Sequence, residues 1–185
     1  MSKGKLFVIS GASGVGKSTV LSRVMKSRPD LSFSVSATTR APRAGEVDGV
    51  SYYFVTKDKF QEMIAQRAFL EYDAHMDNYY GTPRAQLEEK LESGSVILDI
   101  EPNGAFNVRR EKEDAVLIFI APPSLEVLTD RLRGRGDTSE EQIAVRQARV
   151  AWEVEQSKHY DYVVVNDKVD DCVREILEII AREAR

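Results

Sequence analysis

The sequence predicts a single α/β domain with a three-layer α/β/α core, in which a parallel sheet is covered by helices on both faces. Four short apolar runs alternate with segments of helical period, which is the pattern of a parallel sheet. A glycine-rich loop follows the first run and opens a helix. With 185 residues, of which 42% are hydrophobic, the chain suits one packed core. The four runs are 6–10, 96–100, 116–120 and 162–165.

The first half of the chain is expected to add two short strands and two helices to this core. The loop opens a helix whose apolar face is Val20, Leu21, Val24 and Met25. Residues 33–36 alternate like a half-buried strand, and residues 52–55 form another strand. Thr56 is placed to cap a short helix. The inward face of that helix would be Phe60, Met63 and Ile64. The aromatic stretch 68–83 is expected to be irregular.

The second half is expected to be mostly helical between its strands. A helix around 87–91 ends near Gly94. Ser124 is placed to cap a helix that reaches about residue 133, and Ser139 with Gln142 makes a capping box for a long helix that reaches about residue 157. The last helix is amphipathic, with an apolar face of Val173, Ile176, Leu177 and Ile180.

The composition of the chain argues against several classes of protein. The net charge of −4 argues against general nucleic-acid binding. No run approaches eighteen consecutive apolar residues, so no membrane association is expected. The one cysteine, Cys172, allows no internal disulfide, and the short stretch before the first strand leads us to expect no signal peptide. These features predict a cytoplasmic protein, and they leave the oligomeric state open.

The loop at residues 11–18 matches the phosphate-binding pattern G-x-x-x-x-G-K-S in full. Its glycines let backbone N–H groups turn toward one anion, and the helix that follows adds a positive partial charge. Lys17 is placed to reach the β- and γ-phosphates, and the Ser18 hydroxyl is placed to bind Mg²⁺. Asp99 ends a buried strand, where it could hold Mg²⁺ through water, and Glu101 follows closely. A pair of solvated carboxylates at a strand end is the alternative for those two residues.

A second segment is rich in side chains that bind phosphates and bases. Two arginines three residues apart and two tyrosines could clamp one phosphate, and Glu71 with nearby hydroxyls could bind a base edge. A GTPase-type base motif such as Asn-Lys-x-Asp is absent from the sequence. The side chains of this segment are Ser36, Arg40, Arg43, Tyr52, Glu71, Tyr80 and Thr82.

Four stretches resemble the guanylate kinase family in order and in spacing. Together with the phosphate loop they run from about residue 5 to residue 167. They are "SATTRAPRAGEVDGVSYYFV", "FLEYDAHMDNYYGTP", "IAPPSLEVLTDRLRGRG" and "YDYVVVND". The resemblance implies transfer of the γ-phosphate of ATP to GMP, and to dGMP, in GMP recycling. It also implies a core at about 1–32, 84–124 and 151–185, a GMP-binding insertion at about 33–83, and a small helical lid at about 125–150.

The resemblance further implies a role for individual side chains. The GMP phosphate would be held by Arg40, Arg43, Tyr52 and Tyr80. Guanine would be bound by Ser36, Glu71 and Thr82, with Glu101 assisting. ATP would be bound by Gly11, Ala12, Ser13, Gly14, Val15, Gly16, Lys17, Ser18, Thr19, Arg131, Asn166 and Asp167. The charges of the reaction would be neutralised by Lys17, Arg43, Arg135 and Arg146. Arg133 and Arg149 are left outside this site.

Three positions depart from the commonest form of the family. Ala12 stands where proline is frequent, Glu101 where aspartate is usual, and Asn103 where glutamine is usual. Two other interpretations remain at this point. One is a guanylate-kinase-like module that binds phosphorylated peptides without chemistry, and the other is a phosphate-loop kinase that acts on a different nucleotide or on a phosphorylated sugar.

Overall fold

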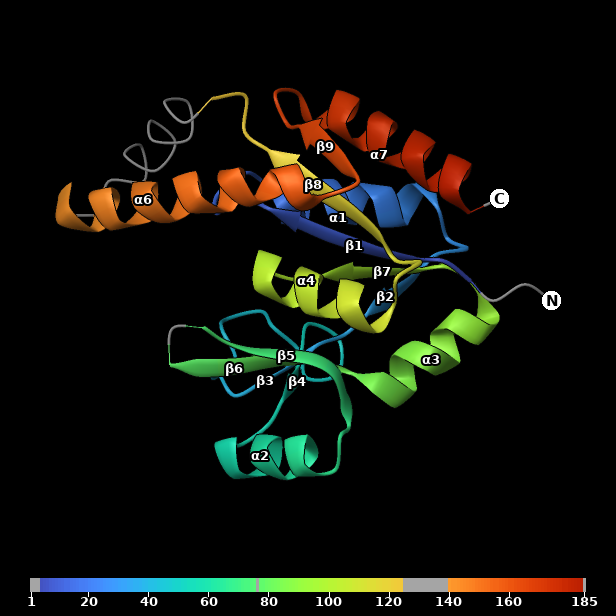
Figure 1. Ribbon diagram of the computed structural model, residues 1–185, viewed down its shortest axis with the longest axis vertical. Coiled ribbons are helices and arrows are strands. Elements are labelled where there is room, and N and C mark those ends of the chain that lie inside the picture. The colour runs from blue at the N-terminus through green and yellow to red at the C-terminus, as the bar shows by residue number, and fades with distance from the viewer. Residues whose placement is uncertain (1–3, 76, 125–139, 185) are drawn as a thin grey trace. The chain divides into compact units, whose positions relative to one another are not determined.

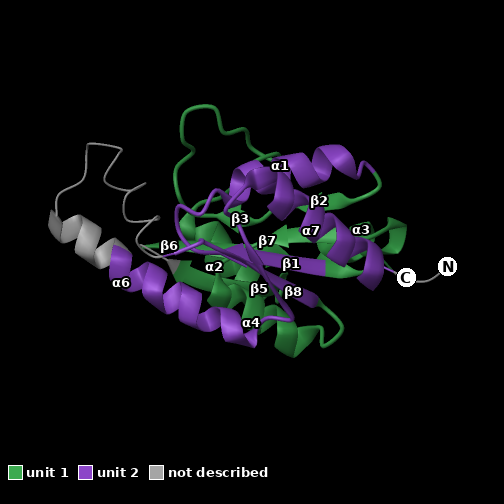
Figure 2. Ribbon diagram, turned by 90° about the horizontal axis from the view of Figure 1, so that it is seen from above, with its two compact units in different colours: residues 1–6, 30–115 green, residues 7–29, 116–185 purple. Residues whose placement is uncertain are grey.

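The computed structural model describes residues 4–75, 77–124 and 140–184, which fall into two compact units (Figures 1 and 2). Unit 1 comprises residues 1–6 and 30–115, and unit 2 comprises residues 7–29 and 116–185.

Unit 2 is built on three parallel strands. They are β1 (Leu6–Gly11), β8 (Val116–Ala121) and β9 (Tyr162–Val165). Strand β8 lies between the other two, with Ile9 opposite Ile118 and Ile120 opposite Val164. Every residue of β1 and β8 is buried, so both faces of these strands are covered. This confirms three of the four apolar strands predicted from the sequence.

Helices cover both sides of these strands. They are α1 (Lys17–Ser27), α6 (Glu140–Gln156), the short 3₁₀ helix η1 (Ser157–His159) and α7 (Val169–Glu183). Helix α1 packs against α7, while α6 lies on the opposite side of β1 and β8 (Figures 1 and 2). The layered α/β/α arrangement predicted from the sequence is therefore present. The predicted cap Ser139 and the helix predicted to start at Ser124 fall outside the described residues.

Unit 1 contains a strand pair and a separate four-stranded sheet. The pair is β2 (Ser32–Ser34) and β7 (Val96–Asp99), which run parallel, and β7 is the fourth of the predicted apolar strands. The sheet has the order β4-β3-β6-β5. Its members are β3 (Ala37–Thr38), β4 (Tyr53–Phe54), β5 (Phe69–His75) and β6 (Asn78–Pro83). Strand β3 runs parallel to β4 and antiparallel to β6.

One prediction for this unit is wrong, and one is confirmed only in part. The stretch 68–83 is not irregular, because β5 and β6 form an antiparallel hairpin that places Glu71 opposite Thr82. The hairpin turns at Asp77, a non-glycine residue with a φ of 63°. The strand predicted at 33–36 is interrupted, because β2 ends at Ser34 and β3 begins at Ala37.

Three helices belong to unit 1. They are α2 (Lys57–Ala65), α3 (Arg84–Ser93) and α4 (Pro102–Glu111). Thr56 caps α2 as predicted, since its hydroxyl accepts the Lys59 N–H at 3.1 Å. Phe60 lies in the core of this unit, where its ring stacks on Phe69 at 4.4 Å and on Tyr79 at 5.4 Å between ring centres. Helix α4 was not predicted, and it packs against β5.

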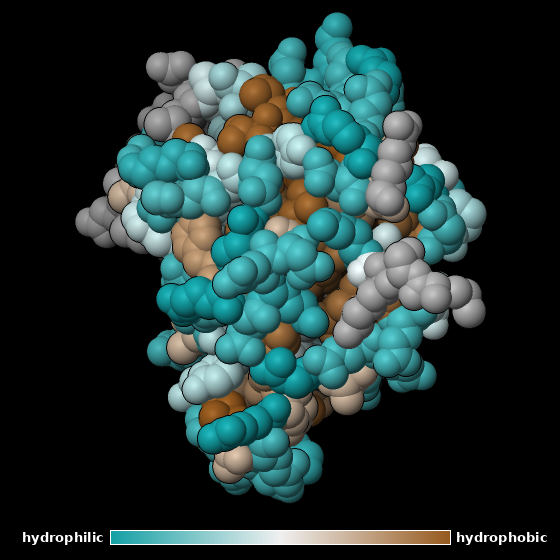
Figure 3. Space-filling model, turned by 45° about the vertical axis from the view of Figure 1, so that its right-hand side comes forward, coloured by the Kyte–Doolittle hydropathy of each residue, from teal (hydrophilic) through white to brown (hydrophobic). Residues whose placement is uncertain are grey.

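No helix among residues 4–75, 77–124 and 140–184 is long and apolar enough to cross a bilayer. On the face shown in Figure 3, hydrophilic side chains predominate, and hydrophobic ones show as small patches between them.

Candidate active site

The phosphate loop of unit 2 lies between the strand and the helix that its sequence pattern requires. It leaves β1 at Gly11 and enters α1 at Lys17. Gly14 and Gly16 have φ angles of 82° and 93°, a left-handed conformation that glycine adopts without strain. Gly16 is the N-cap of α1 and brings no capping side chain. Gly16 thus contributes no side-chain acceptor to the first N–H groups of α1, at the end of the helix that attracts anions.

Hydrogen bonds from other parts of unit 2 fix the loop backbone at three residues. The Ala12 N–H donates to the Ile120 carbonyl at 3.2 Å, and the Ser13 N–H donates to the Glu153 carboxylate at 2.7 Å. The Val15 carbonyl accepts a hydrogen bond from the buried Asn166 side chain at 2.8 Å. These contacts fix the loop backbone before any ligand binds, so its shape is set by unit 2 itself.

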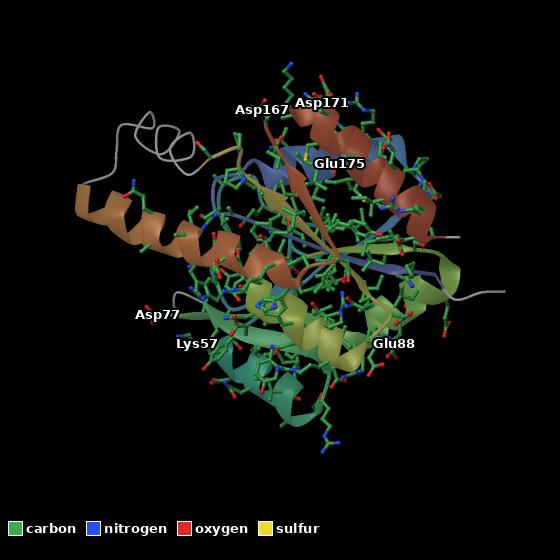
Figure 4. The ribbon with its side chains drawn as sticks, turned by 45° about the horizontal axis from the view of Figure 1, so that its top comes forward. Lys57, Asp77, Glu88, Asp167, Asp171 and Glu175 are labelled. Carbon is green, nitrogen blue, oxygen red and sulfur yellow. The ribbon has the colours of Figure 1, made fainter. Side chains whose placement is uncertain are left out.

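The other residues predicted for ATP lie at different depths in unit 2. Ser18 and Thr19 are exposed on the first turn of α1, and Lys17 is half-buried. Asp167 follows β9 and is exposed, as are Asp171 and Glu175 on the helix that comes next (Figure 4). Arg131 and Arg135 lie outside the described residues, and Arg146 belongs to α6.

In unit 1, a cationic and aromatic cluster forms from residues predicted to hold the GMP phosphate. The Arg40 guanidinium lies 5.5 Å from the centre of the Tyr52 ring, and that ring meets Tyr80 edge to face at 6.1 Å. Arg40 also donates two hydrogen bonds to Glu46, at 2.8 and 3.0 Å. Glu46 accepts the backbone N–H of Arg43 at 2.7 Å. One carboxylate therefore organises both arginines.

The charges of this cluster stabilise each other. The hydrogen bond with Glu46 raises the pKa of Arg40, and the same contact lowers the pKa of Glu46. The Arg43 side chain is exposed, so its guanidinium can reach an anion without displacing a buried contact.

A buried carboxylate lies in the same sheet. Glu71 on β5 is only 6% exposed, and its Oε1 accepts the Thr82 hydroxyl at 2.6 Å. Burial is the main cause that raises the pKa of Glu71 to about 7, and the hydrogen bond from Thr82 opposes this rise. A buried carboxylate that is bound to a neutral hydroxyl is suited to accept further hydrogen bonds from a neutral ligand.

The register of the hairpin brings the two clusters to one face. Glu71 pairs with Thr82, and Asp73 pairs with Tyr80. Residues two apart on a strand point to the same side, so Tyr80 and Thr82 share a face of β6. The phosphate cluster and the buried carboxylate therefore lie side by side in unit 1.

Gly104 completes the surroundings of Glu71. A β-carbon built on Gly104 would lie 2.8 Å from Glu71 Oε2 and 3.2 Å from Ile100 Cδ1. Real β-carbons essentially never approach another atom as closely as the first of these distances. A side chain at position 104 would therefore displace the Glu71 carboxylate, which is the end of a flexible side chain, from its present position.

The remaining predicted residues of unit 1 lie in three different settings. Ser36 is buried between β2 and β3, and its carbonyl accepts the Tyr53 N–H at 2.9 Å. Glu101 is the exposed N-cap residue of α4. Asp99 ends β7 and is half-buried. Among the residues that the structure describes, no three acidic, histidine or cysteine side chains gather as a metal cluster.

Four residues with contacts in these two clusters or at the phosphate loop were given no role from the sequence, and one of them, Arg149, was considered and left outside the site. They are Glu46, Gly104, Arg149 and Glu153. The pair Arg149 and Glu153 carried a signal, because residues four apart meet on a helix face. The contact between Glu153 and the loop joins positions 140 apart in the sequence, so no local sequence pattern predicts it.

The chain is similar to known proteins over nearly its full length. The family model for guanylate kinase matches residues 3–183. Guanylate kinase of Synechocystis sp. is 47% identical over 182 residues, covering 98% of this chain and 95% of that protein. Guanylate kinase of Thermus thermophilus is 47% identical over 184 residues, covering 99% and 83%. The crystal structure of guanylate kinase from Anaplasma phagocytophilum is similar with a TM-score of 0.82 and 33% identity, covering 99% of this chain and 87% of that one.

Proposed function

Since this chain belongs to the guanylate kinase family, we propose that it transfers the γ-phosphate of ATP to GMP and releases ADP and GDP. The observation that carries the choice of substrate is the buried Glu71 carboxylate beside the Thr82 hydroxyl. Guanine presents its N1–H and N2–H as adjacent donors, and a carboxylate accepts both. Adenine has an acceptor at N1, which would face the carboxylate without a hydrogen bond. A mismatch of this kind in a buried polar site can discriminate by about 10⁴.

The GMP site would occupy the sheet face that carries these two clusters. Arg40, Arg43, Tyr52 and Tyr80 would hold the phosphate. Ser36 and Thr82 would support Glu71 at the base, with Glu101 assisting from the start of α4. The contact between Arg40 and Glu46 supports this assignment, because a guanidinium already held in a bidentate pair has a defined direction.

The ATP site would be formed by the phosphate loop, residues 11–19, and by the end of β9 at Asn166 and Asp167. Mg²⁺ prefers one or two protein oxygens together with substrate phosphates and water. The exposed Ser18 hydroxyl offers an oxygen of that type in unit 2, and the half-buried Asp99 carboxylate offers one in unit 1, so each is a candidate ligand of the ion on its own. When bound, Mg²⁺ would neutralise charge on the transferred phosphate.

Phosphoryl transfer requires positively charged side chains placed beside the reacting phosphates. A phosphate oxygen of GMP attacks the γ-phosphorus of ATP, and the bond from that phosphorus to the β–γ bridging oxygen breaks. The nucleophile is already ionised, so no general base is needed. Lys17 and Arg43 would neutralise the two polyanions as they approach. Arg146 on α6 and Arg135, which lies outside the described residues, are proposed to do the same.

A coupled ADP-release assay with ATP and a panel of acceptors tests the proposal. GMP is expected to be the best acceptor, with dGMP also accepted because the proposed base contacts do not involve the ribose 2′-hydroxyl. AMP and UMP are expected to be poor. Comparable rates with AMP or UMP would contradict the role of Glu71, and absence of turnover with every acceptor would favour a binding module. We further propose a cytoplasmic location, supported by a single cysteine, Cys172, that is buried and free.

A further inference from the structure

A buried carboxylate on α6 lies beneath the phosphate loop. Glu153 is fully buried, and its two oxygens bind different partners. Oε2 accepts the backbone N–H of Ser13 at 2.7 Å, and Oε1 accepts the Arg149 Nε–H at 2.8 Å. Ser13 lies inside the phosphate-loop pattern, 140 positions away in the sequence. A single side chain therefore joins the loop to the helix that also carries Arg146.

Burying this carboxylate destabilises the folded protein unless an opposite charge or hydrogen bonds compensate for the lost hydration. Burying an ionised carboxylate is unfavourable, and a negative charge close to a polyphosphate site opposes the ligand. Arg149 supplies the compensating charge from one helical turn away. Its side chain is 28% exposed, while that of Glu153 is 0% exposed. The pair is thus an anchor with its acceptor end buried against the loop and its cationic end toward solvent.

The other two anchors of the loop are uncharged. They are the Ile120 carbonyl, which accepts from Ala12, and the Asn166 side chain, which donates to Val15. Hydrogen bonds to a charged acceptor are shorter and roughly twice as strong as neutral ones. A bond of this kind fixes the backbone of the loop at Ser13. The next residue is Gly14, whose left-handed φ of 82° turns the chain toward α1.

We propose that Glu153 is a positioning residue for ATP. It fixes the Ser13 amide so that the following N–H groups of the loop face the phosphates, and it ties that geometry to α6 through Arg149. Glu153 acts through the loop backbone and makes no contact with the reacting atoms. Its loss loosens the ATP site and leaves unit 1, which carries the proposed GMP site, unchanged. This inference rests on the proposed function of the loop.

The test compares two substitutions at this position. Glu153→Gln keeps one acceptor for Ser13 and loses the charge, and Glu153→Leu loses both. We expect the KM for ATP to rise about tenfold in the first variant, as for the loss of one charge-assisted hydrogen bond, and further in the second. The KM for GMP is expected to stay within about twofold of the wild-type value in both. Glu155→Gln is the matched control, because Glu155 lies on the same helix, is exposed, and pairs with Lys158.

Amide hydrogen exchange gives a second readout that does not depend on activity. The Ser13 amide should exchange at least about tenfold faster in Glu153→Gln than in the wild type, while amides of β8 keep their protection. Arg149→Met should shift the KM for ATP in the same direction, and the double variant should show less than the sum of the two effects. An unchanged KM for ATP with unchanged Ser13 exchange would overturn the proposal. So would an equal loss for ATP and GMP together with a lower melting temperature, which is the result of a purely structural role.

Discussion

The Glu71 carboxylate lies 2.8 Å from the position that a β-carbon on Gly104 would occupy. The atom nearest to that position is the end of a flexible side chain, so a larger residue at 104 would move the carboxylate more readily than the backbone. The missing side chain of Gly104 thus sets where Glu71 can point.

Gly104→Ala is expected to impair GMP more than ATP. The new methyl group displaces Oε2, and a misplacement of this size in a binding site can lower the rate by about ten- to a hundredfold. We expect that loss in kcat/KM for GMP, with the KM for ATP nearly unchanged. Asn107→Ala, elsewhere on α4, is the control and should behave as the wild type. A Gly104→Ala enzyme with normal GMP kinetics would show that the carboxylate need not stay in place.

The affinity for GMP should depend on pH because of Glu71. Its carboxyl must be ionised to accept both guanine N–H groups, and burial raises its pKa from 4.5 to about 7. Below that value the protonated fraction grows as the pH falls, and only the ionised fraction is competent to bind. GMP affinity is therefore expected to weaken by up to about tenfold per pH unit below about pH 7, and to level off about one unit above it.

Calorimetric titration of GMP from about pH 5.5 to about pH 8.5 measures this dependence. The phosphate of GMP also titrates, with a second pKa of about 6. Glu71→Gln shares that titration and lacks the carboxyl, so the difference between the two proteins isolates Glu71. Parallel pH profiles in the two proteins would rule out the ionisation of Glu71 as the cause.

Lys17→Ala should abolish phosphoryl transfer with the fold intact. Lys17 is half-buried at the start of α1, so its removal costs little packing. Loss of a charge aimed at the transferred phosphate is expected to lower turnover at least about a hundredfold. Turnover is compared with circular dichroism on the same sample. Near-normal turnover would refute the assignment of the loop to ATP.

Thr56→Ala tests the local account of unit 1. The Thr56 hydroxyl accepts the Lys59 N–H at the start of α2, the helix that presents Phe60 to the core. Loss of such a cap costs about 1 kcal/mol of unfolding free energy. Thr56→Ser keeps the hydroxyl and should lose much less. Urea unfolding of the wild type and both variants measures these differences. A Thr56→Ala protein as stable as the wild type would mean that the cap contributes nothing.

Elements with a continuous apolar run could be predicted from the sequence. Strands β1, β8 and β9 lie where their apolar runs predict them, and α7 buries its predicted apolar face. The phosphate loop was equally clear, because each position of its pattern has a mechanical reason.

The missed elements lack such local signals. Helix α4 contains Gly104 and Asn103 in its first turn, both poor helix formers, and packing against β5 stabilises it regardless. The β5–β6 hairpin turns at Asp77 with no glycine, so the usual turn signal is missing. In the site, Glu71 and Arg40 could be predicted as ligand-binding residues from their side-chain chemistry. The contacts of Glu46, Gly104 and Glu153 form only in the folded chain, so the sequence did not predict them.

The kinetics of Glu71→Gln at about pH 8, where the wild-type carboxyl is ionised, test the central claim most directly. The amide keeps the size of the side chain, but its NH₂ would face a donor of guanine, a buried mismatch of about 1–3 kcal/mol. We expect kcat/KM for GMP to fall by about ten- to a hundredfold and the KM for ATP to stay within about twofold of the wild-type value. AMP should become relatively less poor as an acceptor. An equal fall for ATP and GMP, or no fall at all, would contradict the central claim and would show that Glu71 does not select guanine.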